Sequence, residues 1–225
     1  MSEFGWDDPM AADPASVMLF GAPKVGKTHW ALFNMPSPVY VADTDKRSGH
    51  IAVKATAAGK EIYRKACINM GDVRNVVAAA LKAADGVDAP GTFVFDGASD
   101  LLDLAQDEYL RETQADKIYP KVVWARVYRK IDKLIEALQR RGFFVVYLCR
   151  EHAEYVGDQP TGKVTHEGYK RLPFKSDVVM RHCKDKLAVA ACGFSRKPPT
   201  VVDVNLPWGQ LYEMLSTEQE EKSNG

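Results

Sequence analysis

The segment from Gly21 to Thr28 has residue types and a spacing that suit the binding of a nucleoside triphosphate. It follows the pattern G-x-x-x-x-G-K-[ST], in which the glycines allow the backbone to wrap closely around phosphates. Backbone N–H groups and the positive end of the following helix then face the anion. In this pattern Lys27 reaches the β- and γ-phosphates, and the Thr28 hydroxyl ligates Mg²⁺. The residues expected to contact ATP are Gly21, Ala22, Pro23, Lys24, Val25, Gly26, Lys27, Thr28 and His29.

The sequence on either side of this loop predicts the strand and the helix that the motif needs. Val17 to Phe20 is a short apolar run, which is typical of a buried strand. His29 to Asn34 continues as a helix until Met35-Pro36 ends it, because proline disrupts a helix interior. This order of strand, loop and helix is the context that distinguishes a phosphate loop from a chance match.

Two aspartates follow buried strands, and each could act beside the triphosphate. The strand from Thr92 to Asp96 is continuously apolar, as expected of a parallel strand that is covered on both faces. Its terminal carboxylate, Asp96, can hold Mg²⁺ through water; alternatively, it caps the helix that starts at Ala98. The strand from Pro38 to Asp43 leads to Asp45, and its carboxyl end can place a carboxylate near the γ-phosphate.

A third buried strand, Phe143 to Cys149, is followed by Arg150 and His152. Polar residues at the carboxyl end of a parallel strand can face a ligand, or they can be the solvated charges of a loop. Residues 153–175 then combine glycines with cations and predict a mobile basic loop whose cations contact phosphates. An ordinary surface excursion is the alternative. The lysines and arginine of this loop are Lys163, Lys170, Arg171 and Lys175.

The rest of the chain predicts an α/β fold. Strands alternate with helices over the first 150 residues, which favours a mainly parallel sheet flanked by helices. An antiparallel hairpin from Asp177 to Cys192, with its turn at Lys184-Asp185, extends this sheet. Residues 1–15 are expected to form an arm, residues 16–215 one core, and residues 216–225 a disordered tail. Further expected elements are strands at Ile62–Tyr63 and Cys67–Met70, a helix capped by Asp72 that ends at Asp85-Gly86, helices at Leu101–Leu110 and Val123–Leu138, and a short strand and helix within residues 201–215.

Composition and charge exclude several classes of protein. The chain has 30 basic and 30 acidic side chains, so a nucleic-acid contact would need a local basic patch rather than overall charge. The four cysteines lie far apart without a C-x-x-C pair, which indicates reduced thiols rather than a zinc or dithiol site. There is no signal peptide and no apolar run of membrane-spanning length, so we expect a cytoplasmic protein without a membrane partner.

The order of these motifs resembles the RecA-like P-loop ATPase core, over about residues 16–205. Within that group the chain is most similar to the phage-encoded ATPases of the Sak single-strand-annealing type. Pro23-Lys24 inside the loop resembles the G-x-P-K-x-G-K-T form of that phage group. Val41 to Asp45 is similar to the segment that carries the catalytic carboxylate, Phe93 to Ser99 to the Walker B strand, and Phe144 to His152 to the strand of the γ-phosphate sensor.

The resemblance implies a role for each group. Asp45 orients and deprotonates the attacking water, and Arg150 or His152, with His152 preferred, senses the γ-phosphate. Arg196, or Lys197, reaches the phosphate of a neighbouring subunit in a homo-oligomer. The resemblance also implies single-stranded DNA as the partner of the 153–175 loop, in phage recombination or annealing. A phage single-strand-binding protein is a further candidate partner.

The sequence departs from the family pattern at two positions. Asp45 stands where the family carries a glutamate, which points to slower water activation or to a role shared with Asp43. Phe194 stands where the basic motif usually has a lysine. Two other classes of protein stay open: a small-molecule or nucleotide kinase, with Arg111 to Lys121 as its lid, and a non-hydrolysing nucleotide switch or scaffold.

Overall fold

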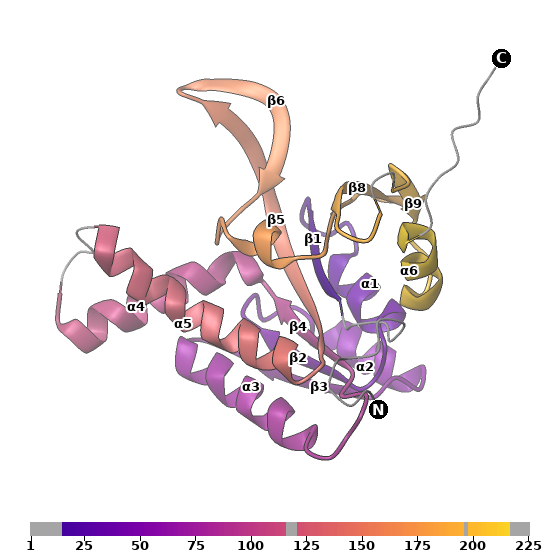
Figure 1. Ribbon diagram of the computed structural model, residues 1–225, viewed down its shortest axis with the longest axis horizontal. Helices are drawn as coiled ribbons and strands as arrows, with labels where there is room; N and C mark the ends of the chain where they lie inside the picture. Colours follow the sequence, from indigo (N-terminus) through magenta and orange to yellow (C-terminus); the bar gives the residue numbers. More distant parts are fainter. Residues whose placement is uncertain (1–14, 116–120, 196–197, 217–225) are drawn as a thin grey trace, which may run out of the picture.

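The computed structural model describes residues 15–115, 121–195 and 198–216, and within them the strands form one nine-stranded sheet (Figure 1). The strands follow the order β3-β2-β4-β5-β1-β7-β8-β9, and β6 pairs with β5 outside that path. They are β1 (Ser16–Gly21), β2 (Val39–Asp43), β3 (Ile62–Ala66), β4 (Thr92–Asp96), β5 (Phe144–Val156), β6 (Gln159–His166), β7 (Val178–His182), β8 (Lys186–Cys192) and β9 (Val201–Asp203).

Helices cover both faces of the sheet. One apolar core lies between the sheet and α3, α4 and α5, and a second lies between the sheet and α1, α2 and α6. In β1, Met18 and Phe20 face the first core, while Val17 and Leu19 face the second, which explains the unbroken apolar run. The helices are α1 (Lys27–Asn34), α2 (Gly49–Ala57), α3 (Met70–Ala83), α4 (Leu101–Thr113), α5 (Lys121–Arg140) and α6 (Trp208–Ser216), with short 3₁₀ helices η1 (Ala98–Asp100) and η2 (Leu172–Lys175).

The strand register brings the carboxyl ends of four strands to one edge of the sheet. β5 lies between β1 and β4 and is parallel to both, with Gly21 opposite Arg150 and Asp96 opposite Leu148. β2 is parallel to β4, with Asp43 opposite Asp96. The predicted mainly parallel sheet flanked by helices is therefore confirmed. The predicted antiparallel extension is also confirmed, since β7 runs parallel to β1 and then pairs antiparallel with β8.

The region before α3 differs from the sequence-based expectation. Helix α2 lacks a clear signal and was not predicted. Cys67 to Met70 does not form a strand: Met70 already begins α3. The cap of α3 is Asn69, whose side chain accepts a hydrogen bond from the backbone N–H of Asp72 at 2.9 Å. Asp72 therefore lies in the first turn, where its negative charge favours the helix N-terminus.

The expected mobile loop at residues 153–175 is instead a β-hairpin followed by η2. Strand β5 continues past Cys149 to Val156 and returns as antiparallel β6. Figure 1 shows this β5–β6 hairpin projecting away from the body of the sheet. Arg150 and His152 therefore belong to a strand rather than to a loop.

Several sequence-based expectations fall outside the described residues. These include all of the predicted arm except Ala15, which is buried, and all of the predicted tail except Ser216, which ends α6. The charged segment from Arg111 to Lys121 is described only at its ends, in α4 and α5.

Among the described helices, none combines the length and the apolar character that a bilayer crossing requires.

Candidate functional site

The phosphate loop joins the buried strand β1 to helix α1 at the carboxyl edge of the sheet. Gly26 precedes α1 with φ of 111°, a left-handed conformation that glycine adopts without steric cost. Gly21 lies directly against β7, since a Cβ at this position would be 2.6 Å from the carbonyl oxygen of His182. The packing of the loop on β7 therefore requires a glycine at position 21, in addition to any requirement of a bound phosphate.

Lys27 lies folded over the phosphate loop. Its Nζ donates hydrogen bonds to the carbonyl oxygens of Gly21 and Ala22, both at 2.8 Å. Burial lowers the pKa of Lys27, while the nearby Asp96 opposes that effect. A bound triphosphate would offer this ammonium stronger acceptors than the two carbonyls. Three other residues expected to contact ATP are exposed, namely Pro23, Lys24 and His29. The half-buried ones are Ala22, Val25, Gly26 and Thr28.

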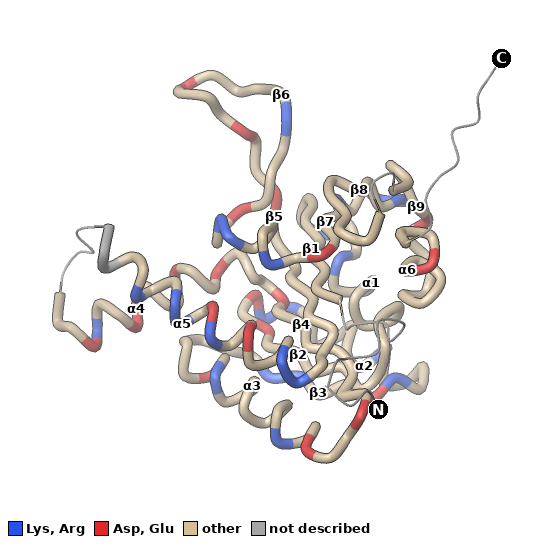
Figure 2. Tube along the Cα trace, viewed as in Figure 1, with Lys and Arg blue, Asp and Glu red and all other residues tan. Residues whose placement is uncertain are grey.

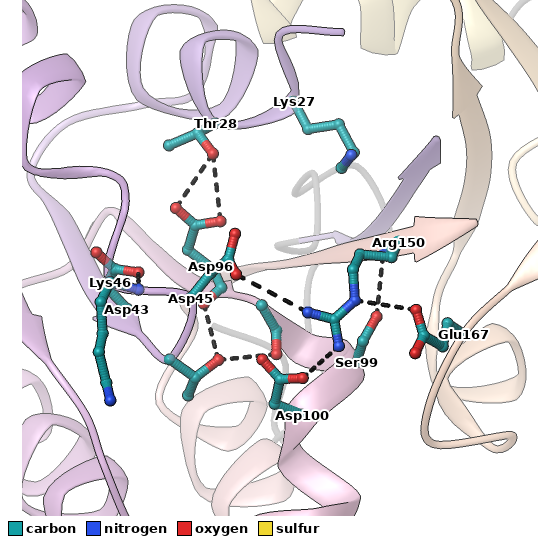
Figure 3. A network of polar contacts seen from close by, with 12 residues as sticks. Lys27, Thr28, Asp43, Asp45, Lys46, Asp96, Ser99, Asp100, Arg150 and Glu167 are labelled. Atoms are coloured by element: carbon teal, nitrogen blue, oxygen red, sulfur yellow. Dashed lines mark hydrogen bonds and ion pairs between the residues drawn. The ribbon is translucent and has the colours of Figure 1, made fainter. Parts of the chain in front are cut away.

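Thr28 and Asp96 meet at the edge of the sheet (Figure 3). The Thr28 hydroxyl donates to the carboxylate of Asp96, with distances of 3.2 and 3.1 Å to its two oxygens. Asp96 is 6% exposed, and burial, together with the charge of Asp43, raises its pKa to about 7. The carboxylate does not cap η1, which follows Gly97 without a side-chain cap.

The chemistry of this pair fits Mg²⁺. The ion takes hard oxygen ligands, and it usually keeps several waters and bonds to substrate phosphates in addition to one or two protein groups. Thr28 and Asp96 supply a hydroxyl and a carboxylate next to the phosphate loop. Among the described residues there is no group of three or more His, Cys, Asp or Glu side chains that could hold a metal by themselves. A nucleotide-bound Mg²⁺ is therefore the metal that these residues suit.

The two aspartates that follow β2 have different environments. Asp43 is fully buried, and its carboxylate accepts hydrogen bonds from the hydroxyl of Ser48 at 2.6 Å and from Arg64 Nε at 2.8 Å. It also accepts from the backbone N–H of Lys46, so it fixes the turn that leads into α2. Asp45 is 36% exposed. Asp45, rather than Asp43, is therefore the more accessible carboxylate at this end of β2.

Arg150 connects three segments around this site (Figure 3). Its guanidinium forms ion pairs with Asp100 of η1, with Glu167 at 2.9 Å and with Asp45 at 3.8 Å. Its backbone N–H donates to the hydroxyl of Ser99 at 2.9 Å. Glu167 directly follows β6, so Arg150 joins the turn after β2 to the base of the β5–β6 hairpin.

The other two expected phosphate-contacting residues are placed differently. His152 is exposed on the hairpin and lies opposite Thr165 of β6 in the strand register. Arg150 is closer to the phosphate loop, since its backbone lies opposite Gly21 in the register of β5 and β1. Arg196 and the adjacent Lys197 lie outside the described residues.

The four cations expected to contact DNA lie on two separate elements. Lys163 is exposed on β6, and Lys170 is exposed just before η2. Arg171 and Lys175 lie against α5, where both pair with Asp132, at 3.5 and 3.1 Å. The hairpin therefore carries only one of these cations, and the other three gather around η2.

His182 is a residue of this site that the sequence did not reveal. It ends β7 and is 4% exposed, and a Cβ at Gly26 would lie 3.4 Å from its ring. Its Nδ1 is buried without a hydrogen-bond partner among the described residues. Burial lowers the pKa of His182, and the charge of Lys27 acts in the same direction. The ring therefore packs against the phosphate loop, where its burial and the charge of Lys27 disfavour the protonated form.

Comparison with known proteins agrees with this geometry. The sequence model of the AAA domain family, AAA_24, matches residues 13–193. The RadB recombinase structure has a TM-score of 0.50 and 12% identity, over 84% of this chain and 85% of that one. A type III secretion ATPase from pathogenic bacteria has a TM-score of 0.51 and 12% identity, over 75% of this chain and 52% of that one. These likenesses show a RecA-like P-loop ATPase fold. No curated protein matches the chain.

Proposed function

The chain belongs to the AAA domain family, and on that basis we propose that it is a Mg²⁺-dependent ATPase. We further propose, on other grounds given below, that it acts on single-stranded DNA. The observation that carries the ATPase proposal is the contact between Thr28 and Asp96 beside Lys27 in the phosphate loop. The ammonium of Lys27 suits the phosphates of ATP, and the oxygens of Thr28 and Asp96 suit Mg²⁺. Phosphoryl transfer depends mainly on such positioning and charge stabilisation.

Each group has a distinct part in this proposal. Lys27 would leave the carbonyl oxygens of its own loop and bind the β- and γ-phosphates. Thr28 and Asp96 would hold Mg²⁺, whose charge would be neutralised in part by the ionised carboxylate. Asp45 would orient and deprotonate the attacking water, because it is the accessible carboxylate of the turn after β2. A non-hydrolysing nucleotide switch is the second candidate. Asp45 is one methylene shorter than the glutamate of the related ATPases, so it would activate the attacking water less well.

Of the two candidate γ-phosphate sensors we favour Arg150 over His152, because Arg150 contacts the turn that carries Asp45. Its ion pairs reach Asp45 on one side and Glu167 on the other. A change in the charge beside Asp45 would therefore alter the contact that holds the base of the β5–β6 hairpin. Arg196 would complete the site of a neighbouring subunit in a homo-oligomer, as its basic motif suggests.

The DNA part of the proposal draws on the resemblance to the phage Sak-type annealing ATPases and on the cations around η2. One structural neighbour is a recombinase, whereas another is a secretion ATPase, so this fold serves more than one process. We assign Lys163, Lys170, Arg171 and Lys175 as the candidate contacts to DNA. The process would be phage recombination or annealing in the cytoplasm of the host, with a phage single-strand-binding protein as a further partner.

Asp45 variants test the hydrolytic part of the proposal. Asp45→Asn should reduce ATP turnover by about a hundredfold or more, in the range of general-base removal, while leaving ATP affinity nearly unchanged. Asp45→Glu should retain turnover. Wild-type protein that binds ATP tightly but shows no turnover would favour the nucleotide switch. A phosphorylated small-molecule product would identify a kinase instead.

A further inference from the structure

Charge is unevenly distributed over the chain, although the total is zero. The β5–β6 hairpin, residues 151–167, carries four acidic residues and one lysine, a net charge of −3 with neutral histidines. Figure 2 shows acidic positions from the base of this hairpin to its tip. Glu151 and Glu167 at its base pair with Arg181 and Arg150, and a single lysine leaves the projecting part with little positive charge, so the main contacts to DNA phosphates are expected elsewhere.

Helix α5 presents a stripe of exposed cations. Arg126, Arg129, Lys133 and Arg140 are all exposed. Because each residue of an α-helix turns by about 100°, these four side chains fall within an arc of about 60°. The stripe spans about 21 Å at 1.5 Å per residue. Glu136 lies about 20° outside this arc and is 3.9 Å from Arg140.

The short helix η2 packs beside this stripe. Lys175 pairs with Asp132 at 3.1 Å and with Glu136 at 3.8 Å, and Arg171 lies over the ring of Tyr128 at 4.7 Å. Asp132 is about 60° around the helix from Arg129, so η2 borders the cations. These pairs neutralise acidic groups of α5 and leave the surrounding positive charges dominant.

Phe174 stands out of this surface. Its side chain is 89% exposed, the highest exposure among the described large apolar residues. It lines an open cleft of about 430 Å³ together with Asp132, Arg171 and Lys175. The turn that carries it is held in place, because Leu172 is buried and Ser176 Oγ donates to the carbonyl oxygen of Leu172 at 2.8 Å. An aromatic ring is thus presented to solvent from a fixed position among cations.

We propose that this α5–η2 surface, defined by Arg129, Lys133, Lys170, Arg171 and Phe174, binds single-stranded DNA. The cations contact the backbone phosphates, and one unpaired base stacks on Phe174. Positive charge that follows a backbone, combined with an aromatic platform, is the usual chemistry of single-strand binding. The inference rests on the proposed function and adds its DNA site, including three residues outside the 153–175 cations considered above.

The α5–η2 surface is also connected to the ATP site by a short stretch of chain. Glu167 pairs with Arg150, and the next residue, Gly168, packs against the backbone of Ser99, where a Cβ would lie 2.4 Å from the carbonyl oxygen. Tyr169 is buried, and its hydroxyl donates to Asp132 at 2.9 Å. A displacement at Arg150 therefore reaches α5 within a few residues, which gives DNA binding a physical link to hydrolysis.

Fluorescence anisotropy with a labelled oligo-dT strand tests the proposal, in Mg²⁺ and ATP over a series of salt concentrations. Phe174→Ala should weaken binding by about tenfold and reduce the preference for single strands over a duplex of equal length, because paired bases cannot stack on the ring. Arg129→Ala with Lys133→Ala should lower the slope of log K against log salt by about 1.4, as expected for two lost phosphate contacts. Thermal unfolding of each variant checks that these exposed substitutions leave the fold intact.

The matched controls lie on other surfaces. Tyr155→Ala removes an aromatic ring that is 59% exposed on the hairpin, and Lys54→Ala with Lys65→Ala removes two exposed cations near β3. Both controls should bind DNA as the wild type does. If wild-type protein binds the strand and the α5–η2 variants match it in affinity and slope, the surface assignment is wrong while the DNA function stands; an acidic protein segment would then be the remaining occupant. If wild-type protein binds no single strand, both the surface and the DNA function are refuted.

Discussion

Replacing Asp96 by asparagine should stabilise the metal-free protein at neutral pH. Burial and the charge of Asp43 raise the pKa of Asp96 from 3.8 to about 7. At 1.36 kcal/mol per pH unit, the ionised carboxylate costs the fold about 4 kcal/mol. The folded protein binds this proton more tightly than the unfolded chain does. The resulting stability is therefore present at low pH and is lost as the pH rises through about 7. Between pH 5 and pH 8 the loss amounts to about 2.5 kcal/mol.

Urea unfolding of both proteins in EDTA at pH 5, 6.5 and 8 measures this effect. Asparagine stays neutral, and its side-chain oxygen can still accept the hydrogen bond of Thr28. The difference in free energy of unfolding should therefore move in favour of Asp96→Asn by about 2.5 kcal/mol from pH 5 to pH 8. Burial lowers the pKa of His166 and His182, but both histidines titrate in wild type and variant alike, so their effect cancels. A difference that stays constant over this range would refute the reasoning.

Three further substitutions test separate parts of the site. Arg64→Ala should destabilise the fold by about 3 kcal/mol in urea unfolding, because it removes a partner of the fully buried Asp43; a loss under about 1 kcal/mol would contradict that role. His182→Ala should weaken ATP binding by about tenfold in a nucleotide titration, as a cavity opens beside Gly26, whereas an unchanged affinity would show that the loop keeps its shape alone. Arg150→Ala should remove most of the stimulation of ATP turnover by DNA; full stimulation in this variant would exclude Arg150 as the link to Glu167.

The parts of the site that the sequence predicted are those with local requirements. The phosphate loop depends on glycines, a lysine and a threonine at fixed spacing, and it forms between the expected strand and helix. The unbroken apolar run before Asp96 indicated a buried parallel strand, and the strand register confirms it. In both cases a few adjacent residues are enough to predict the local structure.

The parts that were missed depend on contacts between distant segments. His182 ends a strand parallel to β1, so the rule that identified Asp96 applies to it as well. The sequence indicates only the antiparallel pairing of this strand with β8, and its parallel pairing with β1 depends on contacts across the sheet. The separate environments of Asp43 and Asp45 likewise depend on Arg64, which lies on another strand.

The β5–β6 hairpin could have been recognised from the sequence. Gly157-Asp158 lies between Tyr155-Val156 and the segment from Gln159, and a Gly-Asp pair between two extended runs is typical of a hairpin turn. Glycines alone indicate backbone freedom, which is why they also fit the mobile loop expected over residues 153–175. Asn69 was also recognisable, because an asparagine three residues before an aspartate is a common helix start.

The most direct test of the account is steady-state ATP hydrolysis with and without single-stranded DNA, at low salt, by wild-type protein and Lys27→Ala. We expect Mg²⁺-dependent turnover that DNA stimulates, and loss of that turnover in Lys27→Ala, because the phosphates lose their ammonium partner. Unchanged hydrolysis by Lys27→Ala would contradict the assignment of the phosphate loop as the catalytic site. Turnover that ignores DNA in the wild type would contradict the coupling between the ATP site and a DNA surface.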